Sequence, residues 1–162
     1  MEADIGDRLH IKDNITLITV YSNSGTGIIP LIFNLIAQRG VRVYTITFAF
    51  PYKSETIISF AVDGDCLSPV MSAMGEAKRQ GASFFYRVKT DNAGITLNGV
   101  GVSSKTDTVA RVLEKLLEAD ICPGTVSTDA DALSVFVDEA VLPEAIAKLK
   151  TLSTDEKGVD TV

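Results

Sequence analysis

The chain has 162 residues, a hydrophobic fraction of 46%, a charged fraction of 22% and a formal net charge of −6. This length suffices for one ordinary domain or two small ones with a buried core. The acidic balance argues against nucleic acids and anionic membranes as partners, because both attract basic surfaces. No apolar run reaches the roughly 18 residues of a membrane span, and the acidic, polar N-terminus is unlike a signal peptide. We therefore expect a cytoplasmic protein.

The first half of the chain predicts a β-α-β-β-α-β unit. Pro30 is tolerated only in the first turn of a helix and Gly40 favours a helix end, so these two residues frame the first helix. In the second helix, Ser68 is the expected cap and Pro69 the expected first residue. The predicted elements are a strand at 15–22, a helix at 27–40, strands at 41–50 and 56–62, a helix at 66–80 and a strand at 83–90.

The second half repeats this order at a distance of roughly 75 to 80 residues. The strand at 95–102 opens like residues 15–17. A helix at 106–120, strands at 121–128 and 132–138, and a helix at 140–150 follow it. The chain therefore predicts two similar α/β units, with a boundary near residues 91–94.

The second unit lacks a good last strand, because the C-terminal sequence "TLSTDEKGVDTV" is polar and does not alternate. The N-terminal segment "RLHIKD" is a surplus strand. We therefore expect residues 8–12 to pair into the sheet of the second unit and complete it. The predicted domains are 13–92 for the first unit, 93–152 with 8–12 for the second, and 153–162 as a polar tail. The expected class is α+β, with a ferredoxin-like βαββαβ order in each unit.

The chain offers few catalytic or metal-ligating residues. His10 is the sole histidine, and an isolated histidine without a partner motif is usually an ordinary strand residue. Cys66 and Cys122 lack CxxC spacing and predict buried free thiols. Two aspartate pairs lack the length and closing glutamate of a calcium loop and are expected in turns or caps: Asp63 with Asp65, and Asp129 with Asp131. We expect no catalytic residue, no metal site and no cofactor.

Residues 99–139 resemble the second ACT domain of aspartate kinases, and residues 27–43 are similar to the first. The matching positions are Gly99, Val100, Gly101, Ala110, Leu116, Glu118, Ala119, Ile121, Ser127, Thr128, Ser134, Val135, Val137 and Asp138, and in the first unit Gly27, Ile32, Phe33, Leu35, Gly40 and Val43. The resemblance covers nearly the whole chain. It implies two ferredoxin-like ACT units in tandem, intertwined as in those kinases.

The segment "SNSGTGIIPLIFNLIAQRG" (22–40) has neither the Lys-Ser or Lys-Thr pair of a P-loop nor a full G-x-G-x-x-G. In ACT domains this loop and helix start hold an amino-acid effector. Free N–H groups and the helix dipole favour a carboxylate there, and glycines allow close approach. The alternative is a plain turn and helix start. The implied effector site comprises Asn23, Ser24, Gly25, Thr26, Gly27, Ile28 and Ile29, with the backbone of Val41, Arg42 and Val43 closing the pocket.

Several positions depart from the family pattern. The first loop has Ser24–Gly27 where the family has Asp-x-Pro-Gly, and Arg42 stands where it has asparagine. Arg42 would favour an acidic or neutral ligand if it points inward, but arginine more often points to solvent. In the second unit, Thr106 and Asp107 replace the Pro-Gly pair. Asp107 would repel a carboxylate, so we expect any effector in the first unit.

The resemblance implies an allosteric regulatory module, either the regulatory end or the small regulatory subunit of an aspartate kinase. Lysine or threonine would then shift a linked kinase domain or subunit. The alternative is a free-standing tandem that acts as a small-ligand sensor or an assembly scaffold. ACT units commonly join side by side, and the strand at 41–50 is long and apolar enough to serve as the joining edge. We therefore also expect a homodimer through ACT–ACT packing.

Overall fold

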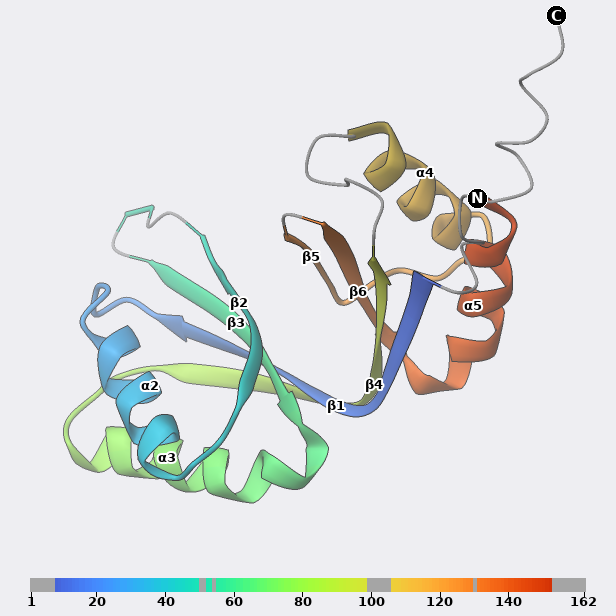
Figure 1. The fold of residues 1–162 in the computed structure, drawn as a ribbon. Coiled ribbons are helices and arrows are strands. Elements are labelled where there is room, and N and C mark those ends of the chain that lie inside the picture. The colour runs from blue at the N-terminus through green and yellow to red at the C-terminus, as the bar shows by residue number, and fades with distance from the viewer. Residues whose placement is uncertain (1–7, 50–51, 54, 99–105, 130, 153–162) are drawn as a thin grey trace, which may run out of the picture. The chain divides into compact units, whose positions relative to one another are not determined.

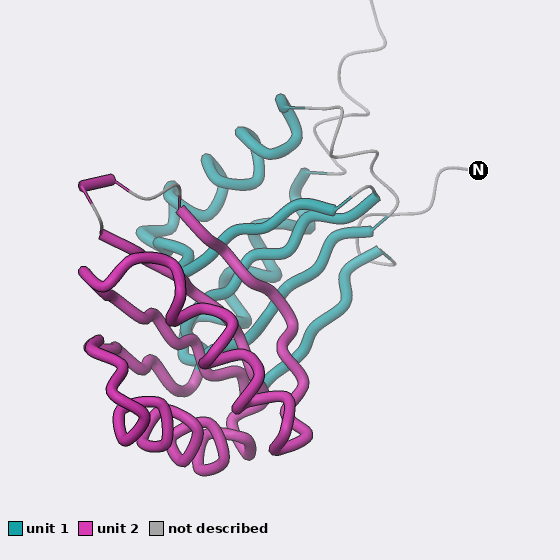
Figure 2. Tube along the Cα trace, turned by 90° about the vertical axis from the view of Figure 1, so that its left-hand side faces the viewer, with its two compact units in different colours: residues 1–13, 92–162 teal, residues 14–91 magenta. Residues whose placement is uncertain are grey.

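The computed structural model describes residues 8–49, 52–53, 55–98, 106–129 and 131–152 (Figure 1). The chain forms two compact units, one of residues 14–91 and the other of residues 1–13 with 92–162 (Figure 2). We call them the 14–91 unit and the 92–162 unit. None of the described helices combines the length and the apolar character that a membrane span requires.

The 14–91 unit places two helices on one face of an antiparallel sheet (Figure 1). Its strand order is β2-β3-β1-β4, and the β1–β3 ladder runs from Ile15 opposite Asp63 to Ser22 opposite Thr56. Its elements are β1 (Leu9–Ser22), α2 (Ile28–Gln38), β2 (Val43–Phe48), β3 (Thr56–Asp63), α3 (Leu67–Arg79) and β4 (Phe85–Asn98).

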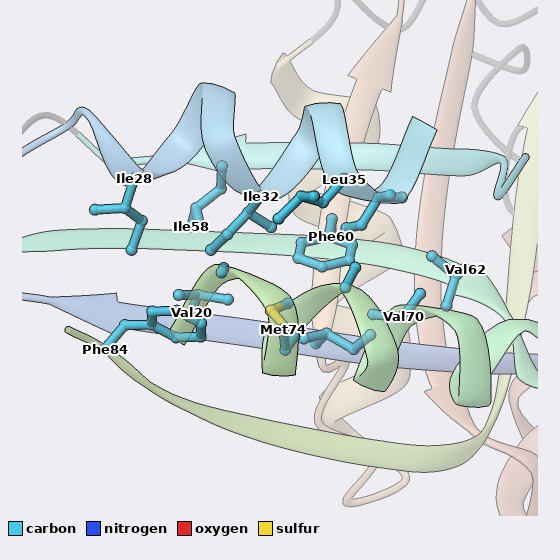
Figure 3. Close-up of a cluster of buried hydrophobic side chains, with 14 residues drawn as sticks. Val20, Ile28, Ile32, Leu35, Ile58, Phe60, Val62, Val70, Met74 and Phe84 are labelled. Atoms are coloured by element: carbon cyan, nitrogen blue, oxygen red, sulfur yellow. The ribbon is translucent and has the colours of Figure 1, made fainter. Parts of the chain in front are cut away.

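The core of the 14–91 unit lies between this sheet and its helices (Figure 3). Alternate residues of β3, such as Ile58 and Phe60, are fully buried because side chains of a strand point in turn to its two faces. Ile32 of α2 and Met74 of α3 cover them at helical spacing. Phe33 meets the Phe60 ring edge to face, with 5.3 Å between the centroids.

The 92–162 unit has the strand order β1-β4-β6-β5. Residues 9–13 of β1 provide its fourth strand, and Leu9 packs against its core. The predicted α+β class, with two ferredoxin-like units and the N-terminal strand completing the second, is therefore confirmed. The remaining elements are α4 (Thr106–Leu117), β5 (Thr125–Asp129), β6 (Ala132–Asp138) and α5 (Leu142–Lys150).

The internal repeat appears as a matched pair of hydrogen bonds. Thr19 Oγ1 lies 2.9 Å from Ser59 Oγ, and Thr96 Oγ1 lies 2.8 Å from Ser134 Oγ. Because Thr19 and Thr96 are equivalent, Ile95 corresponds to Ile18. The sequence similarity between residues 95–97 and 15–17 is therefore offset by three residues from the structural repeat.

Two strands are longer than the sequence predicts. The expected strands at 8–12 and 15–22 form the single strand β1, and those at 83–90 and 95–102 form β4 as far as Asn98. Asn14 and Asp91 stand at equivalent points with φ of 53° and 57°. Asparagine and aspartate tolerate this left-handed conformation better than most residues. Each strand therefore continues through one unusual residue where a break is expected.

The predicted ends of several elements need correction. The helix expected at 66–80 begins at Leu67 after a 3-10 turn at Gly64–Cys66, so Ser68 is inside the helix and caps nothing. The strand expected at 41–50 spans only Val43–Phe48, and the strand expected at 121–128 is Thr125–Asp129. Gly99, Val100, Gly101 and the tail at 153–162 lie outside the described residues.

Candidate functional site

The loop between β1 and α2 is held by hydrogen bonds of its own backbone and of Ser22. The Ser24 N–H donates to Ser22 Oγ at 3.1 Å, and Ser22 Oγ donates to the Ser83 carbonyl at 2.8 Å. Gly25 has φ of 79°, a conformation that glycine adopts without a Cβ penalty. The chain can therefore turn sharply from the end of β1 into α2.

The start of α2 carries no side-chain cap. Gly27 occupies the cap position in helical conformation, and the Ile29 N–H donates to the Thr26 carbonyl at 3.0 Å. The expectation that the N–H groups of Gly27, Ile28 and Ile29 are all available to a ligand is therefore wrong for Ile29. Gly27 and Ile28 remain at the positive end of the helix dipole.

A hollow of about 260 Å³ lies on one side of this loop. Its lining joins the start of α2 to the segment that follows α3, and we call it the polar hollow. The lining residues are Ser24, Gly27, Ile28, Leu31, Gln80, Gly81, Ala82 and Ser83. Because α2 begins here and α3 ends here, a helix N-terminus and a helix C-terminus border the same space.

A second hollow, of about 600 Å³, is bordered by the first turns of α2 and the end of β2. We call it the apolar hollow, since Thr26 alone among its lining side chains is polar. Its lining residues are Thr26, Gly27, Ile29, Pro30, Phe33, Ile46, Phe48 and Ile58. Ile46 and Phe48 are 55% and 45% exposed, so this surface continues onto the sheet edge at β2.

The structure does not bring all the predicted site residues together within one chain. Ser24, Thr26, Gly27, Ile28 and Ile29 line one or both hollows, and Asn23 is exposed in the same loop. Residues 41–43 lie beyond the other end of α2, whose 11 residues span about 16 Å. Val41 and Val43 pack against the core of the 14–91 unit, and Arg42 is exposed. These three residues line neither hollow.

Sequence reasoning missed Gln80–Ser83 on one side and Ile46 and Phe48 on the other. A signal for the first group was present, because β1 and α3 end at the same edge of a βαββαβ unit. The loop after β1 and the loop after α3 must therefore be neighbours. The second group depends on which residues of β2 face the helices, and a bulge between Val43 and Thr45 changes that alternation.

No ionisable side chain lines either hollow. The charged side chains at the end of α3 pair with each other. The Arg79 guanidinium donates hydrogen bonds to Glu76 Oε2 through Nε, at 3.1 Å, and through Nη2. Gln80 Nε2 also donates to Glu76 Oε1 at 3.1 Å. The bonds from Arg79 and then Gln80 hold the pKa of Glu76 below its usual value. These charged side chains therefore pair with each other and stand outside the lining of both hollows.

The candidate ligating residues have structural partners or lie in solvent. Asp63 accepts a hydrogen bond from the Tyr44 hydroxyl at 2.7 Å, and Asp65 accepts one from Asn14 Nδ2 at 3.2 Å. His10 is exposed on β1. Cys66 is a half-buried free thiol and Cys122 an exposed one, so the expectation of buried thiols is wrong for Cys122. Within the described ranges, no group of three or more histidine, cysteine, aspartate or glutamate residues could hold a metal ion.

Comparison with known proteins places the fold. No protein-family model matches the chain, and no curated protein matches it in sequence. Among solved structures, the ligand-free regulatory subunit of aspartate kinase from Thermus thermophilus superposes with a TM-score of 0.78 at 19% identity. The match covers 87% of this chain and 93% of that one.

Two complete kinases show the same similarity over part of their length. Aspartate kinase from Synechocystis gives a TM-score of 0.82 at 18% identity and covers 95% of this chain but 28% of that one. Aspartokinase III from E. coli, in complex with lysine and aspartate, gives a TM-score of 0.68 at 19% identity, and the match covers 88% of this chain and 32% of that one. The resemblance that the sequence indicates is therefore confirmed at the level of fold: the chain has the architecture of an aspartate kinase regulatory subunit.

Proposed function

We propose that the chain is an amino-acid-responsive regulatory module and that the loop between β1 and α2 is part of its effector site. The observation that carries this proposal is the uncapped start of α2, bordered by a polar hollow and an apolar hollow. Backbone N–H groups without intrahelical partners attract a carboxylate. Ser24 and Thr26 add hydroxyl groups beside them. A small zwitterion suits such a site.

The partner of this module is proposed to be an aspartate kinase domain or subunit. Solved structures support this: the chain covers nearly all of a kinase regulatory subunit but less than a third of two complete kinases. The E. coli kinase was solved with lysine bound. Lysine and threonine are therefore the first effectors to test.

A binding assay with loop variants tests the site. A thermal-shift screen of the twenty amino acids identifies the ligand, because saturation at 100 times the Kd stabilises by about 2.7 kcal/mol. Calorimetry then compares the chain with its Asn23→Ala and Thr26→Val variants. We expect weaker binding in at least one of them. If both bind a verified ligand normally, the loop is not the site; if no amino acid binds, the alternative role as an assembly scaffold is favoured.

We also propose that the module forms a homodimer through β2. This strand ends the sheet, and Ile46 and Phe48 expose apolar surface along it. Exposed apolar edges favour pairing with another strand. The segment 41–43 of a second copy would then lie near the effector loop. Light scattering should give a mass twice the 17.3 kDa of one chain. The Ile46→Asp variant should have the mass of a single chain. A 17 kDa species for the unchanged chain at micromolar concentration contradicts the dimer.

A further inference from the structure

We infer that the outer edge of β4, over residues 85–90, binds an extended acidic segment of another protein, which joins the sheet as a further strand. The stacked rings of Tyr21 and Phe85 and the guanidinium of Arg87 would receive the side chains of that segment. This inference concerns the 14–91 unit alone. It goes beyond the proposed function and depends neither on the effector loop nor on the β2 edge.

The edge of β4 is open over its first residues. β6 pairs with β4 only from Asn92 onward, so among the described strands β1 alone neighbours residues 85–90. In this part β4 runs past β1 on the side away from β3 (Figure 3). Alternate N–H and C=O groups of such an edge strand point away from the sheet. The edge therefore offers backbone hydrogen bonds to an extended segment.

Apolar side chains form a row across the sheet and end at this edge. Ile58 faces the helices, so Ile57 points to the other face, where it stands opposite Tyr21. Tyr21 stacks on Phe85, with 4.7 Å between the ring centroids and 7° between the planes. Neighbouring strands lie about 4.8 Å apart, so the two rings stand side by side across the strands. The outer face of Phe85, which is 60% exposed, is therefore where a ring of an added strand would stack.

Arg87 gives this edge a positive charge. It lies two residues after Phe85 on the same face, and its guanidinium carbon is 5.9 Å from the Tyr21 ring centroid. Among the described residues, no carboxylate pairs with Arg87. A carboxylate directly across from Arg87 on an added strand would stabilise the pairing. The edge therefore favours a segment with an aromatic and an acidic residue two positions apart.

A second copy of this chain matches only half of these features. Antiparallel pairing that stacks two Phe85 rings places Arg87 opposite Ser83 of the second copy, which carries no charge. The guanidinium then gains no carboxylate. A foreign acidic segment satisfies both the ring and the charge.

The fold itself does not require the aromatic pair. By the repeat that relates β1 to β4, Asn98 and Arg8 stand where the 14–91 unit has Tyr21 and Phe85. The burial patterns of the two strands agree residue by residue in this register. The same architecture therefore forms with polar side chains at both positions. Exposed aromatic residues beside an unpaired arginine are typical of interaction surfaces.

Fluorescence anisotropy of labelled peptides, with the full chain, tests the inference. The peptides STETFTS and STFTETS carry glutamate and phenylalanine two residues apart, in the orders that antiparallel and parallel pairing require. STKTFTS replaces the glutamate by lysine. A further pair repeats the acidic peptides with N-methyl groups on the amides, which removes the strand hydrogen bonds.

The protein variants remove one feature each. Phe85→Ala removes the exposed ring, and Arg87→Glu reverses the charge. His10→Glu is the matched control, because His10 is the equivalent of Arg87 in the other unit and is also exposed.

We expect one of the two acidic peptides to bind the parent chain and its N-methylated form not to bind. Phe85→Ala should weaken this binding about tenfold, since a stacked ring and its buried area are lost. Arg87→Glu should weaken it roughly fivefold or more and should bind STKTFTS in preference to STETFTS. His10→Glu should bind like the parent chain.

Three results would overturn the inference: no binding of either acidic peptide, equal binding of an N-methylated form, or unchanged affinity in Phe85→Ala or Arg87→Glu. Light scattering adds a fourth. If Phe85→Ala alone halves the mass of the chain in solution, a second copy occupies the edge and the inference is wrong. None of these outcomes bears on the effector loop.

Discussion

Matched substitutions at equivalent core positions would show whether the two units unfold together. Ile18 and Ile95 occupy equivalent positions of β1 and β4 and are 0% and 1% exposed. Ile18 belongs to the core of the 14–91 unit and Ile95 to that of the 92–162 unit. Strands β1 and β4 each contribute residues to both units. Unfolding either unit therefore removes a strand that the other unit needs, and we expect one shared transition.

The expected destabilisation follows from the buried carbon atoms that each change removes. Isoleucine to alanine deletes three carbons, each worth about 0.8 kcal/mol of transfer free energy, or ~2.4 kcal/mol together. The cavity left behind adds a further term, which brings the expected loss to about 3–4 kcal/mol. With a urea slope of roughly 2–3 kcal/mol per molar, the midpoint falls by about 1–2 M. Ile18→Ala and Ile95→Ala should give similar shifts.

The chain contains a natural probe for this experiment. It has four tyrosines and no tryptophan, and Tyr21, Tyr44, Tyr52 and Tyr86 all lie within the 14–91 unit. Tyrosine fluorescence therefore reports that unit alone, whereas far-ultraviolet circular dichroism reports both. Coincident transitions by the two probes indicate shared unfolding.

The informative variant is Ile95→Ala, because its substitution lies in the unit without tyrosine. We expect it to lower the fluorescence midpoint as much as Ile18→Ala does. A fluorescence transition that stays at the parent midpoint, while circular dichroism splits into two steps, would refute the reasoning that shared strands couple the units.

Four further substitutions test local features. Gly40→Ala should lower the free energy of unfolding by about 1 kcal/mol, because Gly40 ends α2 with φ of 69°. Gly27→Ala should not destabilise the chain, because Gly27 has φ of −61° and open space around it. Gly94→Ala should cost about 1–2 kcal/mol, since a Cβ there would lie 3.1 Å from the buried Phe136 ring. Glu76→Gln should lower the urea midpoint at neutral pH, and this difference should shrink as pH falls through the lowered pKa of Glu76; a constant difference from pH 7 to pH 2 would contradict the assignment.

The fold was accessible from the sequence because hydrophobic periodicity and breakers agree along most of the chain. Pro30 and Gly40 frame α2 as predicted within one or two residues. The surplus strand near the N-terminus and the polar sequence where the second unit needs its last strand together predicted that residues 8–12 complete that unit. Continuity of β1 and β4 was not predictable, because "DN" at 13–14 and 91–92 is typical of turns. Here a single left-handed residue suffices.

Only part of the candidate site could be predicted from the sequence. The loop at 23–29 has the glycines and small polar residues that predict a ligand-binding turn, and it does border both hollows. The remaining lining comes from Gln80–Ser83, Ile46 and Phe48, which are brought there by topology and by a bulge in β2. The hydrogen bond from the Ile29 N–H to the Thr26 carbonyl depends on the local geometry of the turn. No residue pattern distinguishes that turn from an open helix start.

If the loop binds an effector as proposed, the shared strands can transmit the effect of binding to the unit that does not contain the loop. Ligand at 100 times its Kd stabilises the 14–91 unit by about 2.7 kcal/mol. If the units unfold together, the slowest amides of β6, which lies entirely in the 92–162 unit, should exchange up to ~100-fold more slowly with the amino acid bound. Hydrogen exchange measured with and without the ligand decides this. Slower exchange confined to α2, α3 and β3 would mean that the signal stops within the 14–91 unit, and regulation would then have to act through that unit alone.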